Sequence, residues 1–182
     1  KPTVNATGII GDAQEFGVNQ ILVIRPPGSK PDRRVTCMPS GNADRMMSAW
    51  VNPTSFEGRN WAQASIGGWG EPERGQKPNM GLSYFTMTGR GQPRFHLYGF
   101  DPRCASPVPR NEWRHVALAV SGDMVRFYVD GILKETINNN GGLVSKLGTL
   151  KTSASTPVDL GDHGNGRGPF NGALDEVRFE SV

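Results

Sequence analysis

The chain has 182 residues, 36% of them hydrophobic and 20% charged, which predicts one folded domain over residues 1–182 and excludes a disordered chain. The net charge of +3 is carried by basic residues scattered along the sequence, so neither a nucleic-acid-binding nor a membrane-binding surface is expected. No apolar run approaches the roughly 20 residues that cross a bilayer, so membrane insertion is not expected either.

The N-terminal residues carry two signals about the origin of the chain. It begins at Lys1 with neither an initiating methionine nor a signal peptide, so we expect a processed protein or a module excised from a longer one. The stretch Asn5-Ala6-Thr7 is an acceptor sequon for N-glycosylation, which matters if the source is a glycosylating secretory system.

Short alternating segments recur along the whole chain, separated by clusters of Gly, Pro, Asn and Asp, and no helical stripe of useful length occurs. This pattern predicts an all-β fold. The segments Met46–Val51 and Ala62–Trp69 are predicted strands, and Tyr84–Met87 and Arg94–Phe100 predict a hairpin. Long irregular loops, which are either mobile or functional, are expected between the strands. They are Glu71–Asn79, Asp101–Arg110 and Asn138–Pro157.

Two cysteines lie far apart in surroundings typical of loops. Cys37 and Cys104 are too few for a disulfide framework or for a zinc site with cysteine ligands. A single bridge between them and two unpaired thiols both remain open, because pairing depends on the compartment and on the separation of the Cα atoms.

The most regular part of the sequence lies in its third quarter. The apolar run His115–Val120 is followed by a turn, by the alternating strand Val125–Val129 and by Asp130-Gly131, which supplies the positive φ values of a two-residue hairpin. With the returning strand Ile132–Ile137, this pattern predicts a three-stranded antiparallel meander. Since His115 opens a run that is apolar on both sides, we expect a packed, hydrogen-bonded histidine rather than a ligand.

The last predicted strand, Gly172–Phe179, is preceded by glycine-rich pieces around Gly89 and Gly164. A phosphate-binding loop needs a strand before it and a helix after it, so that the N–H groups of the helix face the anion. Neither piece is followed by a helical pattern, so phosphate binding is excluded at both.

Four stretches form an ordered series that spans nearly the whole chain. They are Gly8–Gly17 (GIIGDAQEFG), Met46–Pro53 (MMSAWVNP), Asn111–Gly131, which contains a W-x-H-V-A to Y-V-D-G run, and Leu160–Phe179, which ends in F-x-G-x-L-D-E-V-R. In order and spacing they resemble the laminin G-like, concanavalin A-like superfamily, especially its relatives near the pentraxins. The resemblance implies a jelly-roll β-sandwich of two curved antiparallel sheets, in agreement with the all-β pattern.

The resemblance also implies a structural Ca²⁺ near the closing strand, with Asp175 as side-chain ligand and backbone carbonyls from the N-terminal strand. Asp175 shares parity with Val177 and Phe179, so its carboxylate is expected on the core side, where it must be paired, hydrogen-bonded or metal-bound. A salt bridge or a capped turn is the alternative to calcium. The family's first motif usually continues F-D-G, whereas this chain has Phe16-Gly17-Val18-Asn19, which removes one expected carboxylate.

A second oxygen-rich loop precedes the closing strand. In several relatives the equivalent loops hold a ligand or a second ion, which makes Asp162 a second candidate metal ligand, whereas solvated turn residues are the alternative. The polar residues of this loop are Asp159, Asp162, His163 and Asn165.

Sugar binding requires an aromatic platform for the C–H groups of the ring and planar polar side chains for its hydroxyls. The alternation of the second hairpin strand places Arg94, His96 and Tyr98 on one face. Other candidates on neighbouring segments, or on a segment that extends the same sheet, are Trp61, Trp69, Tyr84, Arg126 and Tyr128.

The four tryptophans do not all suit this role. Trp50 and Trp113 lie within apolar strands, so we expect them in the core. Trp69 stands between glycines ahead of a long loop, so we expect it to be exposed and available to a ligand.

These features favour a non-catalytic extracellular binding module of a secreted or cell-surface protein, with a carbohydrate or a glycosylated surface as partner. A structural or adhesion module of the same fold, contacting other domains of its parent protein and using calcium for rigidity, is the alternative. A polysaccharide-active enzyme is less favoured. The paired carboxylates of retaining glycosidases, the strand motifs of polysaccharide lyases and a nucleophile-elbow context are all missing from the sequence.

Overall fold

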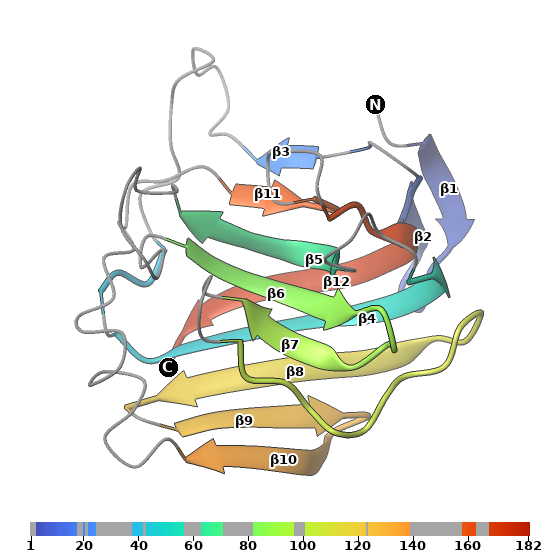
Figure 1. Cartoon of the computed structure of the whole chain (residues 1–182). Helices are drawn as coiled ribbons and strands as arrows, with labels where there is room; N and C mark the ends of the chain where they lie inside the picture. The colour runs from blue at the N-terminus through green and yellow to red at the C-terminus, as the bar shows by residue number, and fades with distance from the viewer. Residues whose placement is uncertain are drawn as a thin grey trace.

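The computed structural model describes residues 3–17, 20, 22–24, 38–41, 43–56, 63–70, 82–96, 101–122, 124–138, 158–162 and 168–182. Within these ranges every regular element is a strand, and the strands form two antiparallel sheets, of which the smaller lies in front of the larger in Figure 1. No helix long and apolar enough to span a membrane occurs in the described ranges. The predicted jelly-roll β-sandwich is confirmed.

The larger sheet, sheet A, contains the predicted meander. Its strand order places β8, β9 and β10 next to one another, and the turn before β10 has positive φ at Asp130 (53°) and Gly131 (75°), as the Asp-Gly pair predicted. In order across the sheet, the strands are β1 (Thr3–Thr7), β2 (Asp12–Phe16), β12 (Asn171–Ser181), β4 (Arg45–Ser55), β8 (Arg114–Ser121), β9 (Met124–Val129) and β10 (Ile132–Asn138).

The smaller sheet, sheet B, contains the predicted hairpin as β6 and β7. Its second strand ends at His96, and residues 97–100 lie outside the described part of the chain. The three-residue strands β3 and β11 were not predicted, because three residues are too few to show an alternation. In order, the strands of sheet B are β3 (Leu22–Ile24), β11 (Val158–Leu160), β5 (Gln63–Gly70), β6 (Leu82–Thr88) and β7 (Pro93–His96).

The core fills the space between the inner faces of the two sheets, and it is built from the alternate residues of each strand. In sheet A, β9 contributes Val125, Phe127 and Val129, as its alternation predicts. In sheet B, the cross-strand pair Phe85 and Phe95 points the same way. The largest side chains with almost no exposed area are Trp69, Arg45, Phe85, Phe95, Phe127, Phe170 and Met47.

A β-bulge in β5 decides which of its side chains enter this core. The register with β6 shifts between Ser65 and Gly67, so Ser65 lies opposite Thr86 on the outer face although it has the same parity as the core residue Trp69. Gly67 is needed at the bulge, because a Cβ there would lie 2.6 Å from Leu160 Cδ2.

A second bulge in β12 overturns the predicted orientation of Asp175. The register with β4 shifts between Asp175 and Arg178, and Glu176 adopts a φ of 47°. Asp175 therefore lies opposite Trp50, on the outer side, whereas Phe179 lies opposite a buried core methionine and packs on the core. The prediction that Asp175 and Phe179 share the core side is wrong, because the extra residue reverses the alternation between them.

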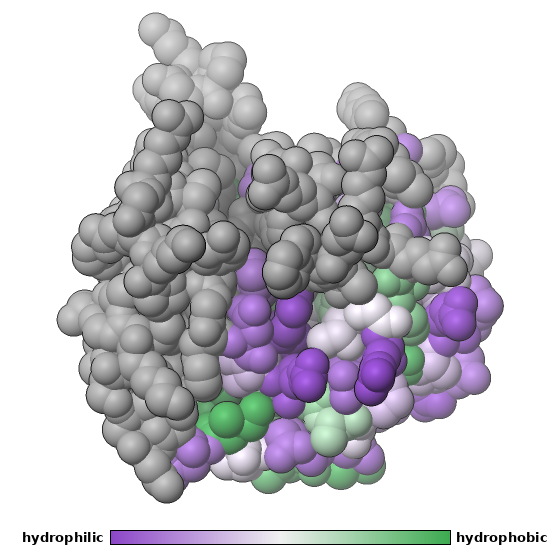
Figure 2. Space-filling model, in the orientation of Figure 1, coloured by the Kyte–Doolittle hydropathy of each residue, from purple (hydrophilic) through white to green (hydrophobic). Residues whose placement is uncertain are grey.

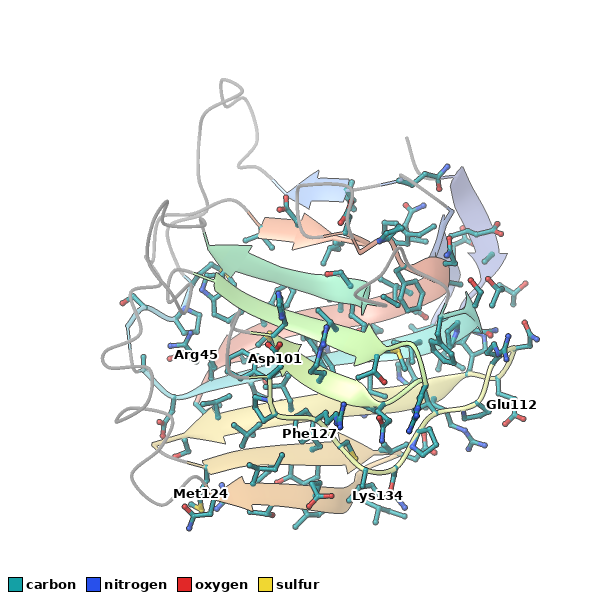
Figure 3. The ribbon with its side chains drawn as sticks, viewed as in Figure 1. Arg45, Asp101, Glu112, Met124, Phe127 and Lys134 are labelled. Atoms are coloured by element: carbon teal, nitrogen blue, oxygen red, sulfur yellow. The ribbon has the colours of Figure 1, made fainter. Side chains whose placement is uncertain are left out.

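A buried arginine closes one end of the sandwich, at the start of β4 (Figure 3). Arg45 has no exposed surface; its Nε donates to the carbonyl of Ala43 at 3.0 Å, and its Nη2 donates to the carbonyl of Gly41. The guanidinium carbon lies 5.5 Å from the ring centroid of Trp69, whose Nε1 donates to the carbonyl of Pro39 at 3.1 Å. Burial lowers the pKa of Arg45 to about 10, which leaves the side chain charged at neutral pH.

We predict that Arg45→Met lowers the free energy of unfolding by about 1–3 kcal/mol, because it removes the donors to the carbonyls of Gly41 and Ala43 and the guanidinium that packs on Trp69. Urea denaturation followed by tryptophan fluorescence measures the change. In the matched control Arg178→Met, the lost arginine is exposed and its ion pair with Glu176 lies at the surface, so the midpoint stays at the wild-type value. Equal midpoints for the two variants would contradict a structural role of Arg45.

Candidate functional site

The outer face of sheet B carries a row of polar side chains across β5, β6 and β7. The register places Ser65 opposite Thr86 and Thr86 opposite Arg94, and a backbone bridge continues the row from Arg94 to Arg103. Figure 2, which views this face, shows hydrophilic residues gathered over β6 and β7. We call these four residues the polar row.

Two atoms of the polar row are buried without a hydrogen-bond partner. They are Nη2 of Arg94 and Oγ of Ser65, and the only other such side-chain atom among the described residues is Oδ1 of Asn52. The Nε of Arg94 does have a partner, since it donates to Oγ1 of Thr86 at 3.1 Å. A buried polar atom without a hydrogen-bond partner costs stability. Two of the three such side-chain atoms among the described residues lie in the polar row.

The pKa of Arg94 lies below its ordinary value, mainly because of burial. The charge of Asp101 raises this pKa, and the charge of Arg103 lowers it. Arg94 is only half-exposed, whereas Arg103 is exposed at the rim of the face. The guanidinium of Arg94 therefore lies in a less polar environment than bulk water, where an interaction with a charged or polar group is stronger.

Beside the polar row lies a histidine paired with an aspartate. His96 is 5% exposed, and its Nδ1 lies 2.8 Å from Oδ1 of Asp101, which Figure 3 shows beside the end of β7. Tyr84 lies opposite His96 in the register of β6 and β7. Arg94 and His96 thus share one face, as predicted, and their ligand-binding role stays a prediction. Tyr98 lies outside the described residues.

Three of the predicted ligand-binding residues lie elsewhere. Trp69 is 0% exposed and meets Phe179 of sheet A edge-on, with ring centroids 5.6 Å apart. The prediction that Trp69 is available to a ligand is therefore wrong, because its ring fills the space between the sheets. Arg126 and Tyr128 lie on β9 of sheet A, so they do not extend the face of sheet B. Trp61 lies outside the described part.

The outer face of sheet A carries an aromatic pair of its own. Trp50 and His115 are half-buried neighbours on β4 and β8, with ring centroids 5.4 Å apart at an interplanar angle of 63°. The prediction that Trp50 and Trp113 lie in the core is wrong, since both are only half-buried. The ring of His115 packs against Trp50, and its backbone N–H donates to Oδ1 of Asp130 at 3.0 Å, whereas the predicted hydrogen bond of its side chain stays a prediction.

The predicted calcium ligand Asp175 is engaged by backbone N–H groups. Its Oδ2 accepts from Ile9 at 2.8 Å and from Ile10 at 3.0 Å, and its Oδ1 accepts from Glu176 at 2.8 Å. The carboxylate thereby holds the turn between β1 and β2, which is the capped-turn alternative. Three donors facing two oxygens fit a cation poorly, so calcium at Asp175 stays a prediction that these contacts do not favour.

The second candidate metal ligand, Asp162, is also engaged by the backbone. Its Oδ1 accepts from the N–H of Gly168 at 3.3 Å, and both Asp162 and Asp159 are buried rather than solvated. His163 and Asn165 lie outside the described residues. No group of three or more His, Cys, Asp or Glu residues suited to a metal ion occurs among those that the structure describes. Calcium at Asp162 likewise stays a prediction.

A bridge between Cys37 and Cys104 was one of the two alternatives that the sequence left open. Cys104 is a free, buried thiol, and Cys37 lies outside the described residues. Burial raises the pKa of the Cys104 thiol, which keeps it protonated and unreactive. Of the two alternatives that the sequence left open, the unpaired thiol is the one observed at Cys104.

Four residues of this face were not among the site residues predicted from the sequence. Arg103 and Asp101 lie in a predicted loop, and no sequence signal places that loop against β7. Ser65 and Thr86 lie on predicted strands, but their joint register with Arg94 depends on the bulge in β5. Polar residues inside otherwise apolar strands were the one signal that could have pointed to them.

Comparisons with known proteins agree with the architecture. A family model described as the concanavalin A-like lectin/glucanases superfamily matches residues 39–182, and no curated protein matches the sequence. Domain 4 of an extracellular GH43 arabinanase from Geobacillus stearothermophilus, solved with arabinotriose, has a TM-score of 0.67 at 19% identity, over 100% of this chain and 75% of that chain.

Two further solved structures share the fold. The CBM40 module of a Ruminococcus gnavus sialidase, bound to α2,3-sialyllactose, has a TM-score of 0.57 at 16% identity, over 77% of this chain and 78% of that chain. The LG4-5 domains of the mouse laminin α1 chain have a TM-score of 0.58 at 14% identity, over 97% of this chain and 44% of that chain. At these identities the likeness concerns the fold.

We predict that a calcium chelator leaves the melting midpoint unchanged, and that Asp175→Asn lowers the free energy of unfolding by about 1–3 kcal/mol because it replaces an acceptor with a donor. Thermal melts of both proteins, with and without chelator, measure this. A bound cation at a hundred times its Kd adds about 2.7 kcal/mol. A chelator response that is present in the wild type and absent in Asp175→Asn would instead place calcium at this carboxylate.

We predict that the melting midpoint falls more steeply between pH 7.5 and 5 in the wild type than in His115→Gln. Burial holds the pKa of His115 below its ordinary value of 6.5, so the unfolded chain takes up the proton first as the pH falls. The stability that neutral His115 contributes above that pKa is therefore lost on acidification. Parallel slopes for the two proteins over this range would contradict the prediction.

Proposed function

Because the chain belongs to the concanavalin A-like lectin/glucanases superfamily, which its match over residues 39–182 shows, we propose that it is a carbohydrate-binding module. The observation that carries the proposal is the polar row on the outer face of sheet B, with two buried polar atoms that lack partners. A sugar offers many hydroxyl oxygens and hydrogens, so it suits a face whose donors are unsatisfied.

The ligand-binding residues of this proposal are Arg94 and His96, joined by the residues that position them. Thr86 holds the Nε of Arg94, and Asp101 holds the Nδ1 of His96. Both contacts restrict side chains that would otherwise rotate freely, which lowers the entropy cost of binding. Tyr84 lies opposite His96 in the register and stays a predicted ligand-binding residue.

The module binds sugars without cleaving them. Two described carboxylates belong to this face, Asp159 on β11 and Asp101 beside β7. The strands β5 and β6 lie between them, so β11 and β7 are about 14 Å apart at the usual spacing of strands. Glycosidases hold their two carboxyl groups about 5–9.5 Å apart, so the spacing of these strands supports binding without cleavage.

The proposed place of action is outside the cell, on a secreted or cell-surface protein. Support comes from the similar structures, one of which belongs to an extracellular arabinanase and another to laminin. Two of the similar structures are sugar-binding by their own descriptions, with arabinotriose and sialyllactose as ligands. In this proposal the partner is a glycan, free or on a glycosylated surface.

We predict that the protein binds members of a panel of immobilised polysaccharides, and that Arg94→Ala weakens this binding at least about tenfold, through the loss of a charged hydrogen-bond donor. Isothermal calorimetry on the best ligand measures the affinity. Arg126→Ala, a half-exposed arginine on sheet A, is the matched control and binds like the wild type.

The same incubations test the absence of cleavage, because a hydrolase or lyase releases new reducing or unsaturated ends. Their absence together with binding supports the module. If no polysaccharide of the panel binds, the proposed function is wrong. If binding persists in Arg94→Ala but is lost in Arg126→Ala, the site lies on sheet A instead.

A further inference from the structure

The polar row on sheet B contains a buried hydrogen-bond donor, Nη2 of Arg94, that has no acceptor. Arginine donates only, so the free Nη2 of Arg94 can be satisfied only by an acceptor oxygen, whereas the hydroxyl of Ser65 can donate or accept. The contact between Nε of Arg94 and Oγ1 of Thr86 places the guanidinium over β6, one strand away from Ser65. A ligand group with two or more acceptor oxygens can serve both atoms together.

The charged groups around Arg94 are mostly positive. Arg94 and Arg103 act on each other through their charges, and Asp101 is the carboxylate that acts on Arg94. One oxygen of Asp101 already pairs with His96. Two positive groups thus face one shared negative group around Arg94, because Asp159, the other described carboxylate of this face, lies on β11, three strands away from β7.

The arginines of sheet A provide the contrast. Arg178 pairs with Glu176 at 2.6 Å, and Arg114 pairs with Glu112 at 2.7 Å and with Asp130 at 3.1 Å. Each of these guanidinium groups has a carboxylate of its own within direct contact. Arg94 differs from them, because its buried Nη2 has no hydrogen-bond partner, and no other described arginine has a buried nitrogen of this kind.

We infer that the site selects acidic saccharides, whose carboxylate or sulfate oxygens accept from Nη2 of Arg94 and from the hydroxyl of Ser65, with Arg103 adding attraction from the rim. This inference rests on the proposed function and names the class of its ligand. The planar fork of Arg94 suits both kinds of anionic group, because each presents at least two oxygens to it. Burial of Arg94 strengthens the attraction, since solvent screens it less.

Two matched ligand pairs test the inference on the whole chain. Polygalacturonate and its methyl ester differ only in the carboxylate, and dextran sulfate and dextran differ only in the sulfate. We expect at least one acidic member to bind at least about tenfold more tightly than its neutral partner, and raised NaCl to weaken that binding. The pair that shows the preference identifies the anionic group.

Variants separate a ligand contact from a structural role. Arg94→Lys keeps the positive charge but loses the planar guanidinium group with its paired donors. We expect this variant to reduce the preference for the acidic member several-fold. Ser65→Ala removes a hydroxyl that has no partner, so we expect weaker acidic binding with an unchanged or raised melting midpoint. A purely structural serine would lower the midpoint instead. Arg126→Gln on sheet A is the control and keeps the preference.

The outcomes distinguish this inference from the function on which it rests. If neutral members bind as tightly as acidic ones and Arg94→Lys changes neither, acid selection is wrong while carbohydrate binding stands. If none of the four polymers binds but a neutral glycan of the wider panel does, acid selection is again wrong. If no glycan of any kind binds, the proposed function itself fails.

Discussion

The burial of Trp69 between the sheets is the contact on which the rest of the structure depends. This one side chain, from the centre of sheet B, touches Phe179 of sheet A, lies under the guanidinium of Arg45 and donates to the carbonyl of Pro39. It therefore joins the two sheets and the chain that enters β4. A large aromatic ring with a satisfied N–H can do this because it provides both a large apolar area and one directed hydrogen bond.

The fixed position of Trp69 also determines which side chains lie on the outer face of sheet B. The bulge before it sends Ser65 outward while Trp69 turns inward, and Gly67 makes that close passage against β11 possible. Ser65 then lines up with Thr86 and Arg94 in one row across three strands. The candidate binding face is thus a consequence of the core, since the same bulge that places the ring inside places the hydroxyl outside.

Arginines on the two outer faces differ in their partners. On sheet A the arginines Arg114 and Arg178 have direct carboxylate partners. On sheet B the buried atoms of the polar row lack partners, which costs stability. Stable proteins tolerate such a cost where it serves a function, because groups that are already paired within the protein are poorly available to a ligand. This difference is the reason to look for the ligand on sheet B.

The sequence by itself determined the all-β architecture, the meander of β8, β9 and β10 with its Asp-Gly turn, and the family, which the match over residues 39–182 confirms. These are encoded locally, in alternation and turn chemistry. The placement of Trp69, Asp175 and the polar row was decided only by tertiary structure. In β5 and β12 a single extra residue reverses the alternation, and whether it bulges depends on contacts with strands far away in the chain.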